Sequence, residues 1–249
     1  MPDSAFLPPA SSPGLPPHQP ALSSTERSTP SRTRHRTVHR TAALHEVLDA
    51  GFLCHVATVR HGAPVTLPTC YGRDGNTLYL HGSSGAHHLR AVSGGQLCVA
   101  VTHVDGIVYA RSLVHHSLNY RSAVIHGTAH AVDGQEEKLH GLRVITDHLA
   151  PGSWQYAREI SRKELASVAV VAVPLAEAAV KIRDDGPNDE PDDVADGSRW
   201  AGVLPLWWGF GEPRPSEDLA APVALPDHVA AREATAHGVT GRTVREPYR

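Results

Sequence analysis

The sequence predicts a mainly β fold: a mostly antiparallel β-barrel with peripheral helices. Residues 52–59 alternate in pattern and are enriched in β-branched types, as in a strand with two different faces. Tight reversals follow at residues 60–64 and 73–76, and the second contains Asp-Gly, which adopts the positive φ angles of a hairpin turn. Short connections favour antiparallel neighbours. About six or seven strands joined in this way, with few helices, are typical of a barrel.

The first half of the chain supplies most of these strands. A helix over residues 41–50 has Thr41 as its candidate cap and ends at Gly51. The three-stranded meander then fills residues 51–82. The segments expected after it are a helix at 84–94, a strand at 96–103, a turn at Asp105-Gly106, a strand at 107–113, and a long strand within 116–132 with Gly127 as a bulge.

The second half combines helices with the most apolar strand. A helix over residues 134–149 stops at Pro151-Gly152, and a short helix is expected at 155–164. Residues 167–173 are continuously apolar, which predicts a central strand buried on both faces. The remaining expected segments are a strand at 179–183, an acidic loop at 184–197, and an apolar stretch at 200–206.

One folded domain is expected between two poorly packed ends. Residues 1–35 are rich in Pro, Ser and Thr, and such a composition buries too little apolar surface to fold, which predicts a disordered leader. The folded domain is placed at residues 36–211. Residues 212–249 are rich in proline and charge, and an extended C-terminal tail is expected there.

Composition narrows the classes of function. A formal charge of −3 and 5% aromatic residues argue against nucleic acid as a partner. No apolar run reaches the roughly 18 residues that would cross a membrane, and no secretory signal is recognised. The three cysteines lie in predicted strands and are interpreted as reduced thiols, which favours a cytoplasmic protein. The 18 histidines are scattered along the chain, so no metal site is predicted from them.

Four stretches together resemble the pyridoxamine 5'-phosphate oxidase-like flavin-nucleotide-binding proteins, a family that includes nitroimidazole-resistance proteins. They are LYLHGSSG at 78–85, VDGIVYARSLVHHSLNYRSAVIHGTA at 104–129, VKIRDDGPNDE at 180–190, and WAGVLPL at 200–206. The resemblance extends over roughly residues 36–211. It implies the FMN-binding split-barrel fold and a homodimer that holds FMN in a groove shared by both subunits.

The resemblance also nominates cofactor-binding residues. Small residues after the third meander strand allow backbone N–H groups to approach a phosphate, and arginine matches phosphate oxygens in two-point contact. Arg121 has an alternative partner in Asp105. The nominated residues are Leu67, Pro68 and Thr69 near the flavin ring, His81, Gly82, Ser83, Ser84 and His87 near the phosphate, and Tyr120, Arg121 and Ser122 for further polar contact.

Several functions follow from the resemblance. The main expectation is an FMN-dependent oxidoreductase acting on a small organic substrate, in which the flavin carries the redox chemistry. The alternatives are a non-catalytic flavin carrier or sensor, and a haem-binding split-barrel protein; deazaflavin is an alternative cofactor. His115 and His116 are the candidate catalytic residues, as proton donors beside a flavin or as a haem ligand. The Arg-rich C-terminal substrate motif of true pyridoxamine-phosphate oxidases is not recognised.

Overall fold

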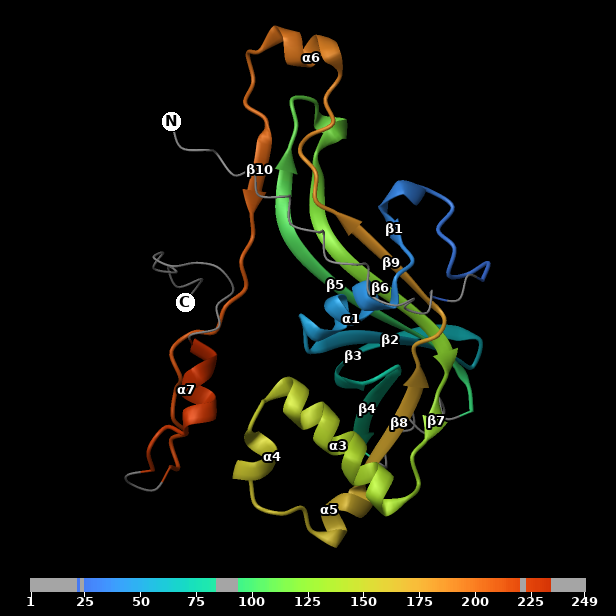
Figure 1. The fold of residues 1–249 in the computed structure, drawn as a ribbon, viewed down its shortest axis with the longest axis vertical. Coiled ribbons are helices and arrows are strands. Elements are labelled where there is room, and N and C mark those ends of the chain that lie inside the picture. Colours follow the sequence, from blue (N-terminus) through green and yellow to red (C-terminus); the bar gives the residue numbers. More distant parts are fainter. Residues whose placement is uncertain (1–21, 23–24, 84–93, 220–222, 234–249) are drawn as a thin grey trace, which may run out of the picture.

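A computed structural model describes residues 22, 25–83, 94–219 and 223–233 of the 249-residue chain. It contains one strongly bent sheet of ten strands in the order β1-β9-β6-β5-β2-β3-β4-β8-β7, with β10 paired to β5 (Figure 1). The strands are β1 (Thr37–Val38), β2 (Leu53–Arg60), β3 (Ala63–Asp74), β4 (Thr77–Ser83), β5 (Gln96–Tyr109), β6 (Ser117–Thr128), β7 (His130–Ala131), β8 (Val168–Pro174), β9 (Ala178–Arg183) and β10 (Gly202–Pro205). The helices are α1 (Thr41–Asp49), α3 (Gln135–Leu149), α4 (Ser153–Tyr156), α5 (Arg162–Ser167), α6 (Pro191–Asp196) and α7 (Asp227–Glu233), with 3-10 turns η1 (Arg34–Arg36) and η2 (Leu113–His115).

The predicted mainly antiparallel barrel is confirmed. Strands β2, β3 and β4 form the expected meander, and Gly75 has the positive φ angle that its hairpin turn requires. Every strand pairing described is antiparallel. No helix among the described residues is long and apolar enough to cross a membrane.

Three expected details of the secondary structure are wrong. Strand β5 continues through the predicted turn at Asp105-Gly106, because a register shift against β6 absorbs the extra residue there. Gly127 forms no bulge, since it pairs regularly with Leu97. The single helix expected at 155–164 is instead the pair α4 and α5. The helix predicted at 84–94 lies almost entirely outside the described residues.

Two apolar clusters hold the fold together. The larger one lies inside the barrel, where α1 packs Leu44 and Leu48 against side chains of β2, β5, β6 and β9. The smaller one lies between α3 and the strands β4 and β8, and it includes Tyr79 and Ile145. Helix α3 reaches β3 closely only because Gly72 has no side chain: a Cβ there would lie 2.5 Å from the Val144 carbonyl oxygen.

The C-terminal end of α1 is fixed by side chains from three other elements. His103 Nε2 on β5 donates to the Val47 carbonyl at 2.9 Å, and His148 Nε2 on α3 donates to the Gly51 carbonyl at 2.5 Å. Between them, the buried Tyr71 hydroxyl on β3 donates to the Leu48 carbonyl at 2.6 Å. Carbonyl groups that a helix end leaves without partners are thus satisfied inside the protein.

Tyr71→Phe is expected to destabilise the protein by about 1–2 kcal/mol, because the buried Leu48 carbonyl would lose its hydrogen-bond donor. Burial also raises the pKa of Tyr71, so the hydroxyl keeps its proton throughout the neutral range. Urea unfolding measures the loss. Tyr156→Phe, at an exposed position of α4, is the matched control and should leave the free energy of unfolding unchanged.

Residues 25–36, which precede β1, pack against the barrel, although residues 1–35 were expected to be disordered. Leu22 is buried in the main core, and Thr25 and Arg27 both bond to the Glu177 carboxylate at 2.5–2.7 Å. The expectation is therefore wrong for residues 25–35. The segment is ordered because Glu177, in the loop between β8 and β9, accepts hydrogen bonds from it. Composition alone does not reveal such a partner.

Glu177 should make this attachment sensitive to acid. The hydrogen bonds from Arg27 and Thr25 lower the pKa of Glu177 from 4.5 to about 2. A folded-state pKa below the unfolded one stabilises the fold above the unfolded pKa, and this stabilisation is lost as the pH falls from about 4.5 to about 2. Unfolding measured across that range should show a shallower pH dependence in Glu177→Gln; an identical slope would contradict the assignment.

The ends of β5 and β6 project beyond the barrel together with the connection from β9 through α6 to β10 (Figure 1). Polar contacts fix this projection. Buried Arg183 donates to the Asn119 side chain and to two carbonyls of the following loop. Arg111 pairs with Asp189 at 2.6 Å, and that carboxylate is nearly inaccessible to solvent. The acidic loop predicted at 184–197 is therefore an ordered part of the fold.

Candidate functional site

One face of the sheet is covered by α1, and the opposite face, here the outer sheet face, carries a flat row of mostly small side chains. The register places Pro68, His55, Ala100, Val124 and Ala179 side by side across β3, β2, β5, β6 and β9. We refer to these five residues as the floor row. Four of them are too short to prevent a planar ring system from lying against the sheet.

A polar row runs parallel to the floor row, two residues further along each strand. It consists of Thr102, Ser122, Lys181 and Thr37 on β5, β6, β9 and β1. Two residues along a strand correspond to about 6.6 Å, so both rows are within reach of one ligand. Among the described residues, Lys181 Nζ donates to the Arg32 carbonyl alone, at 3.3 Å, and so retains further donors.

Arginines border the polar row at the β1 edge. Arg32, Arg34, Arg36 and Arg40, here the basic rim, belong to none of the ion pairs formed by described residues. The Arg36 Nε atom and the Thr37 Oγ1 atom are buried, and neither has a hydrogen-bond partner in the part of the chain that the structure describes. This corner of the outer sheet face therefore combines positive charge with unused donors, which suits an anionic group.

His55 is the one imidazole in the floor row. Its side chain is exposed, and no described residue forms a hydrogen bond or ion pair with it. Its cross-strand neighbours are Pro68 and Ala100, which leave the space above the ring open. An accessible imidazole surrounded by short side chains is a group that can coordinate a haem iron.

Strand alternation divides the predicted flavin-ring residues between two faces. Pro68 lies on the outer sheet face beside His55. Leu67 and Thr69 pair with Val56 and Cys54, whose side chains point into the barrel, so they share the opposite face. Three consecutive residues of a strand cannot all contact a ring through their side chains.

The predicted polar residues on β6 are divided in the same way. Tyr120 and Ser122 share the outer sheet face, whereas Arg121 lies on the other face. There Arg121 forms two bonds to the Asp105 carboxylate, at 2.8 and 3.0 Å, which hold the pKa of the arginine above its usual value. Asp105, the alternative partner that the sequence offered for Arg121, is therefore its partner in the structure. Because the guanidinium already pairs with this carboxylate, it is not available to a phosphate.

The predicted phosphate residues lie at the end of β4. His81, Gly82 and Ser83 follow the pair Tyr71–Leu80, the last at which β3 and β4 are bonded. Burial lowers the pKa of His81, so its ring is neutral at pH 7 and adds no charge to a phosphate site. The other two predicted members, Ser84 and His87, lie outside the described residues.

His115 and His116 lie on the projection and not on the barrel. His116 is eight residues along β6 from Val124 of the floor row, a separation of about 26 Å in an extended strand. Its Nδ1 accepts the Ala110 backbone N–H at 3.1 Å, and its ring contacts Tyr109 edge-on. His115 Nε2 is 3.9 Å from a Glu190 oxygen. Within one chain, neither imidazole reaches the floor row.

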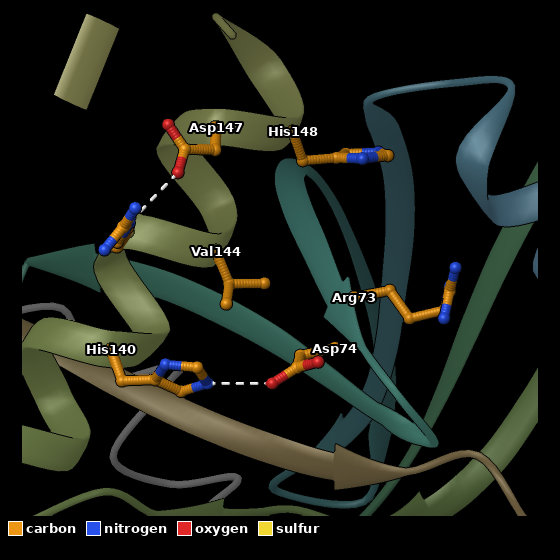
Figure 2. A pocket seen from close by; sticks show the side chains of 7 residues that line it. Arg73, Asp74, His140, Val144, Asp147 and His148 are labelled. Carbon is orange, nitrogen blue, oxygen red and sulfur yellow. Dashed lines mark hydrogen bonds and ion pairs between the residues drawn. The ribbon is translucent and has the colours of Figure 1, made fainter. Parts of the chain in front are cut away.

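A separate cleft of about 410 Å³ lies between α3 and β3. Figure 2 shows two pairs of its polar side chains directed toward each other, with His140 bonded to Asp74 at 3.0 Å and Arg143 to Asp147 at 3.3 Å. Arg73 points away to Asp49 on α1, at 2.5 Å. Because these groups already have partners, the cleft serves as a polar joint that holds α3 to the barrel.

Cysteine and metal chemistry have little support in this part of the chain. Burial raises the pKa of Cys54 to about 12 and that of Cys98 above its usual value, so both thiols stay protonated and unreactive. Among the described residues, no group of three or more His, Cys, Asp or Glu side chains could hold a metal ion. A haem iron, which the porphyrin nitrogens already hold, requires only one protein side chain and no such group.

The sequence did not predict that His55, Lys181 and the basic rim lie on one surface. Alternation along residues 52–59 already places His55 on the face opposite the apolar core residues. Its meeting with Lys181, however, depends on β9 pairing beside β6, a contact between segments distant in the chain.

Comparisons with known proteins agree with this fold. A family model described as pyridoxamine 5'-phosphate oxidase matches residues 40–182. The flavocytochrome Anf3 from Azotobacter vinelandii is 31% identical, with a TM-score of 0.80, over 84% of this chain and 97% of its own. An FAD- and haem-binding protein from Mycobacterium smegmatis is 36% identical, with a TM-score of 0.76, over 80% of this chain and 97% of its own.

More distant similarity concerns the fold alone. A putative 5-nitroimidazole antibiotic resistance protein from Bacteroides thetaiotaomicron is 21% identical over 59% of this chain and 86% of its own, with a TM-score of 0.50. No curated protein sequence matches the chain.

Proposed function

The chain belongs to the pyridoxamine 5'-phosphate oxidase family, and we propose that it is a redox protein that binds both a flavin and a haem. The observation that carries this proposal is the similarity to two flavin- and haem-associated proteins over 97% of each of their lengths. The two matches cover 84% and 80% of this chain, which is more of it than the family model spans.

The comparisons favour FAD over the FMN expected from the sequence, because the Mycobacterium smegmatis relative is described as binding FAD. A dinucleotide carries an additional phosphate and needs a longer polar surface than FMN. The polar row and the basic rim extend along β6, β9 and β1, which supports the longer ligand. Lys181 and Arg36 would hold phosphate oxygens there.

The outer sheet face fits the two planar groups. His55 would supply a nitrogen ligand to the haem iron, and the short side chains of Ala100 and Val124 would leave room for a ring system beside it. Flavins exchange one or two electrons and haem iron exchanges one, so a protein with both can connect a two-electron donor to one-electron chemistry. The chain's part is to hold and orient the two groups.

Analysis of the bound cofactors tests this proposal. Protein purified without added cofactor should release FAD, separated from FMN by chromatography, and should give the spectrum of a haem b after alkaline pyridine treatment. Release of FMN alone, with no haem bound after incubation with haemin, would contradict the proposal and return the chain to the FMN-dependent oxidoreductase expected first.

A further inference from the structure

Residues 25–36, here the N-terminal segment, lie beside β1 and β9 (Figure 1). At the start of the segment, Arg27 forms a two-point bond with the Glu177 carboxylate, with both N–O distances 2.7 Å. Thr25 Oγ1 donates to the same carboxylate at 2.5 Å. These three residues are here the clamp. At its other end the segment continues into β1, which pairs with β9 beside Lys181. The segment is therefore attached near both ends of β9.

The clamp reaches onto the outer sheet face. Arg27 also donates to the Gln96 side chain at 2.9 Å. Gln96 is four residues before Ala100 of the floor row on β5, so its side chain lies on the same face. Glu177 immediately precedes β9 and is two residues before Ala179, the floor-row residue of that strand. The clamp thus borders the floor row on the side opposite the polar row.

The N-terminal segment carries most of the basic rim, namely Arg32, Arg34 and Arg36. Lys181 Nζ donates to the Arg32 carbonyl at 3.3 Å, which joins the middle of the segment to the polar row. In this corner Arg36 Nε and Thr37 Oγ1 are buried without a hydrogen-bond partner among the described residues, which points to a ligand that supplies one. Where these groups lie depends on how the segment is held.

The two flavin cofactors differ in the part that would meet this segment. FMN ends in one phosphate, whereas FAD continues with a second phosphate and adenosine. Lys181 lies on β9, whose place is fixed by pairing with β6 and not by the clamp. The second phosphate would instead meet the basic rim. A binding group on a loosely held loop must be ordered when the ligand binds, and this cost lowers affinity. The clamp therefore benefits the part of FAD that FMN lacks.

We propose that the clamp sets the preference for FAD over FMN: Glu177 fixes the N-terminal segment, and the fixed segment presents the basic rim to the second phosphate. Glu177 is a positioning residue, because it bonds to the segment and would not touch the cofactor. The inference rests on the proposed function for the presence of a flavin, and it adds the residue that decides which flavin is retained.

Separate titrations of the apoprotein with FAD and with FMN test the proposal. The wild type should bind FAD more tightly than FMN. Glu177→Gln and Arg27→Ala should each raise the dissociation constant of FAD about tenfold and that of FMN less than about twofold. The double variant should lose no more than either single one, because both remove the same contact. Equal weakening of both flavins would reveal a merely structural role and overturn the proposal, as would an unchanged affinity for FAD.

Glu164→Gln is the matched control. It disrupts another Arg–Glu pair, with Arg158 at 2.5 Å, on α5 before β8, a strand outside the floor row. Both dissociation constants should stay at their wild-type values. A wild type that binds neither flavin would contradict the proposed function itself. A preference for FAD that survives loss of the clamp would contradict this inference alone.

Trypsin cleavage of the apoprotein tests the clamp without any cofactor. Cleavage after Arg32 and Arg34 should be at least about tenfold faster in Glu177→Gln than in the wild type, because the freed segment fits a protease more readily. Cleavage after Arg158, which is exposed, is the internal reference and should be unchanged. Equal rates at Arg32 in both proteins would show that Glu177 does not hold the segment, and would overturn the proposal.

Discussion

His55→Ala is expected to abolish haem retention while leaving flavin bound and the fold intact. The imidazole is the only nitrogen ligand that the floor row offers, and its removal leaves alanine, proline and valine side chains that cannot coordinate iron. The side chain is exposed and without a partner among the described residues, so the loss should not unfold the barrel. The ratio of Soret to protein absorbance should fall to the background level.

A rescue experiment separates ligation from indirect effects. His55→Gly incubated with haemin and free imidazole should recover a Soret band that neither addition restores alone. His130→Ala, at an exposed histidine on β7, is the control and should retain haem at the wild-type level. Full haem retention by both His55 variants without imidazole would remove His55 from the site.

Gly72→Ala is expected to cause the largest loss of stability, about 3 kcal/mol, by separating α3 from the barrel. The new Cβ would lie 2.5 Å from the Val144 carbonyl oxygen and 2.7 Å from the Ile145 Cα. Both are backbone atoms of a helix, so no side-chain rotation relieves the contact, and overpacking of this kind is costly.

Unfolding in urea measures this effect, and the position of α3 offers a second readout. His148 would leave the Gly51 carbonyl, which would expose the end of α1 and speed amide hydrogen exchange there. Gly211→Ala meets nothing within 4 Å and is the control, with no expected change. Wild-type stability for Gly72→Ala would show that α3 can shift without cost.

Local patterns predicted most of the strands. The meander of β2, β3 and β4 follows from alternation and from the Asp-Gly turn at residues 74–75, both of which act within a few residues. The continuity of β5 through Asp105 was not predictable in this way. Asp-Gly there resembles a turn, but pairing with β6 on one edge and β10 on the other keeps the strand extended.

In the candidate site, too, some features follow from local sequence patterns and others depend on pairing between distant segments. The nominated residues that the structure describes lie on β3, β4 and β6, and neighbours such as Arg121 and Ser122 point to opposite faces, a distinction that the motif alone does not make. His55 was recoverable from alternation, whereas Lys181 joins it only through the β6–β9 pairing. The contact of the N-terminal segment with Glu177 likewise depends on tertiary structure, since it joins segments distant in the chain.

The visible absorption spectrum of the purified protein tests the central claim most directly. It should be recorded as isolated and again after incubation with FAD and haemin followed by desalting. The account predicts a Soret band together with flavin absorption, both retained after desalting and present in similar molar amounts. A flavin band without any Soret band after reconstitution would contradict the haem site at His55, and the absence of both would contradict a cofactor role for the outer sheet face.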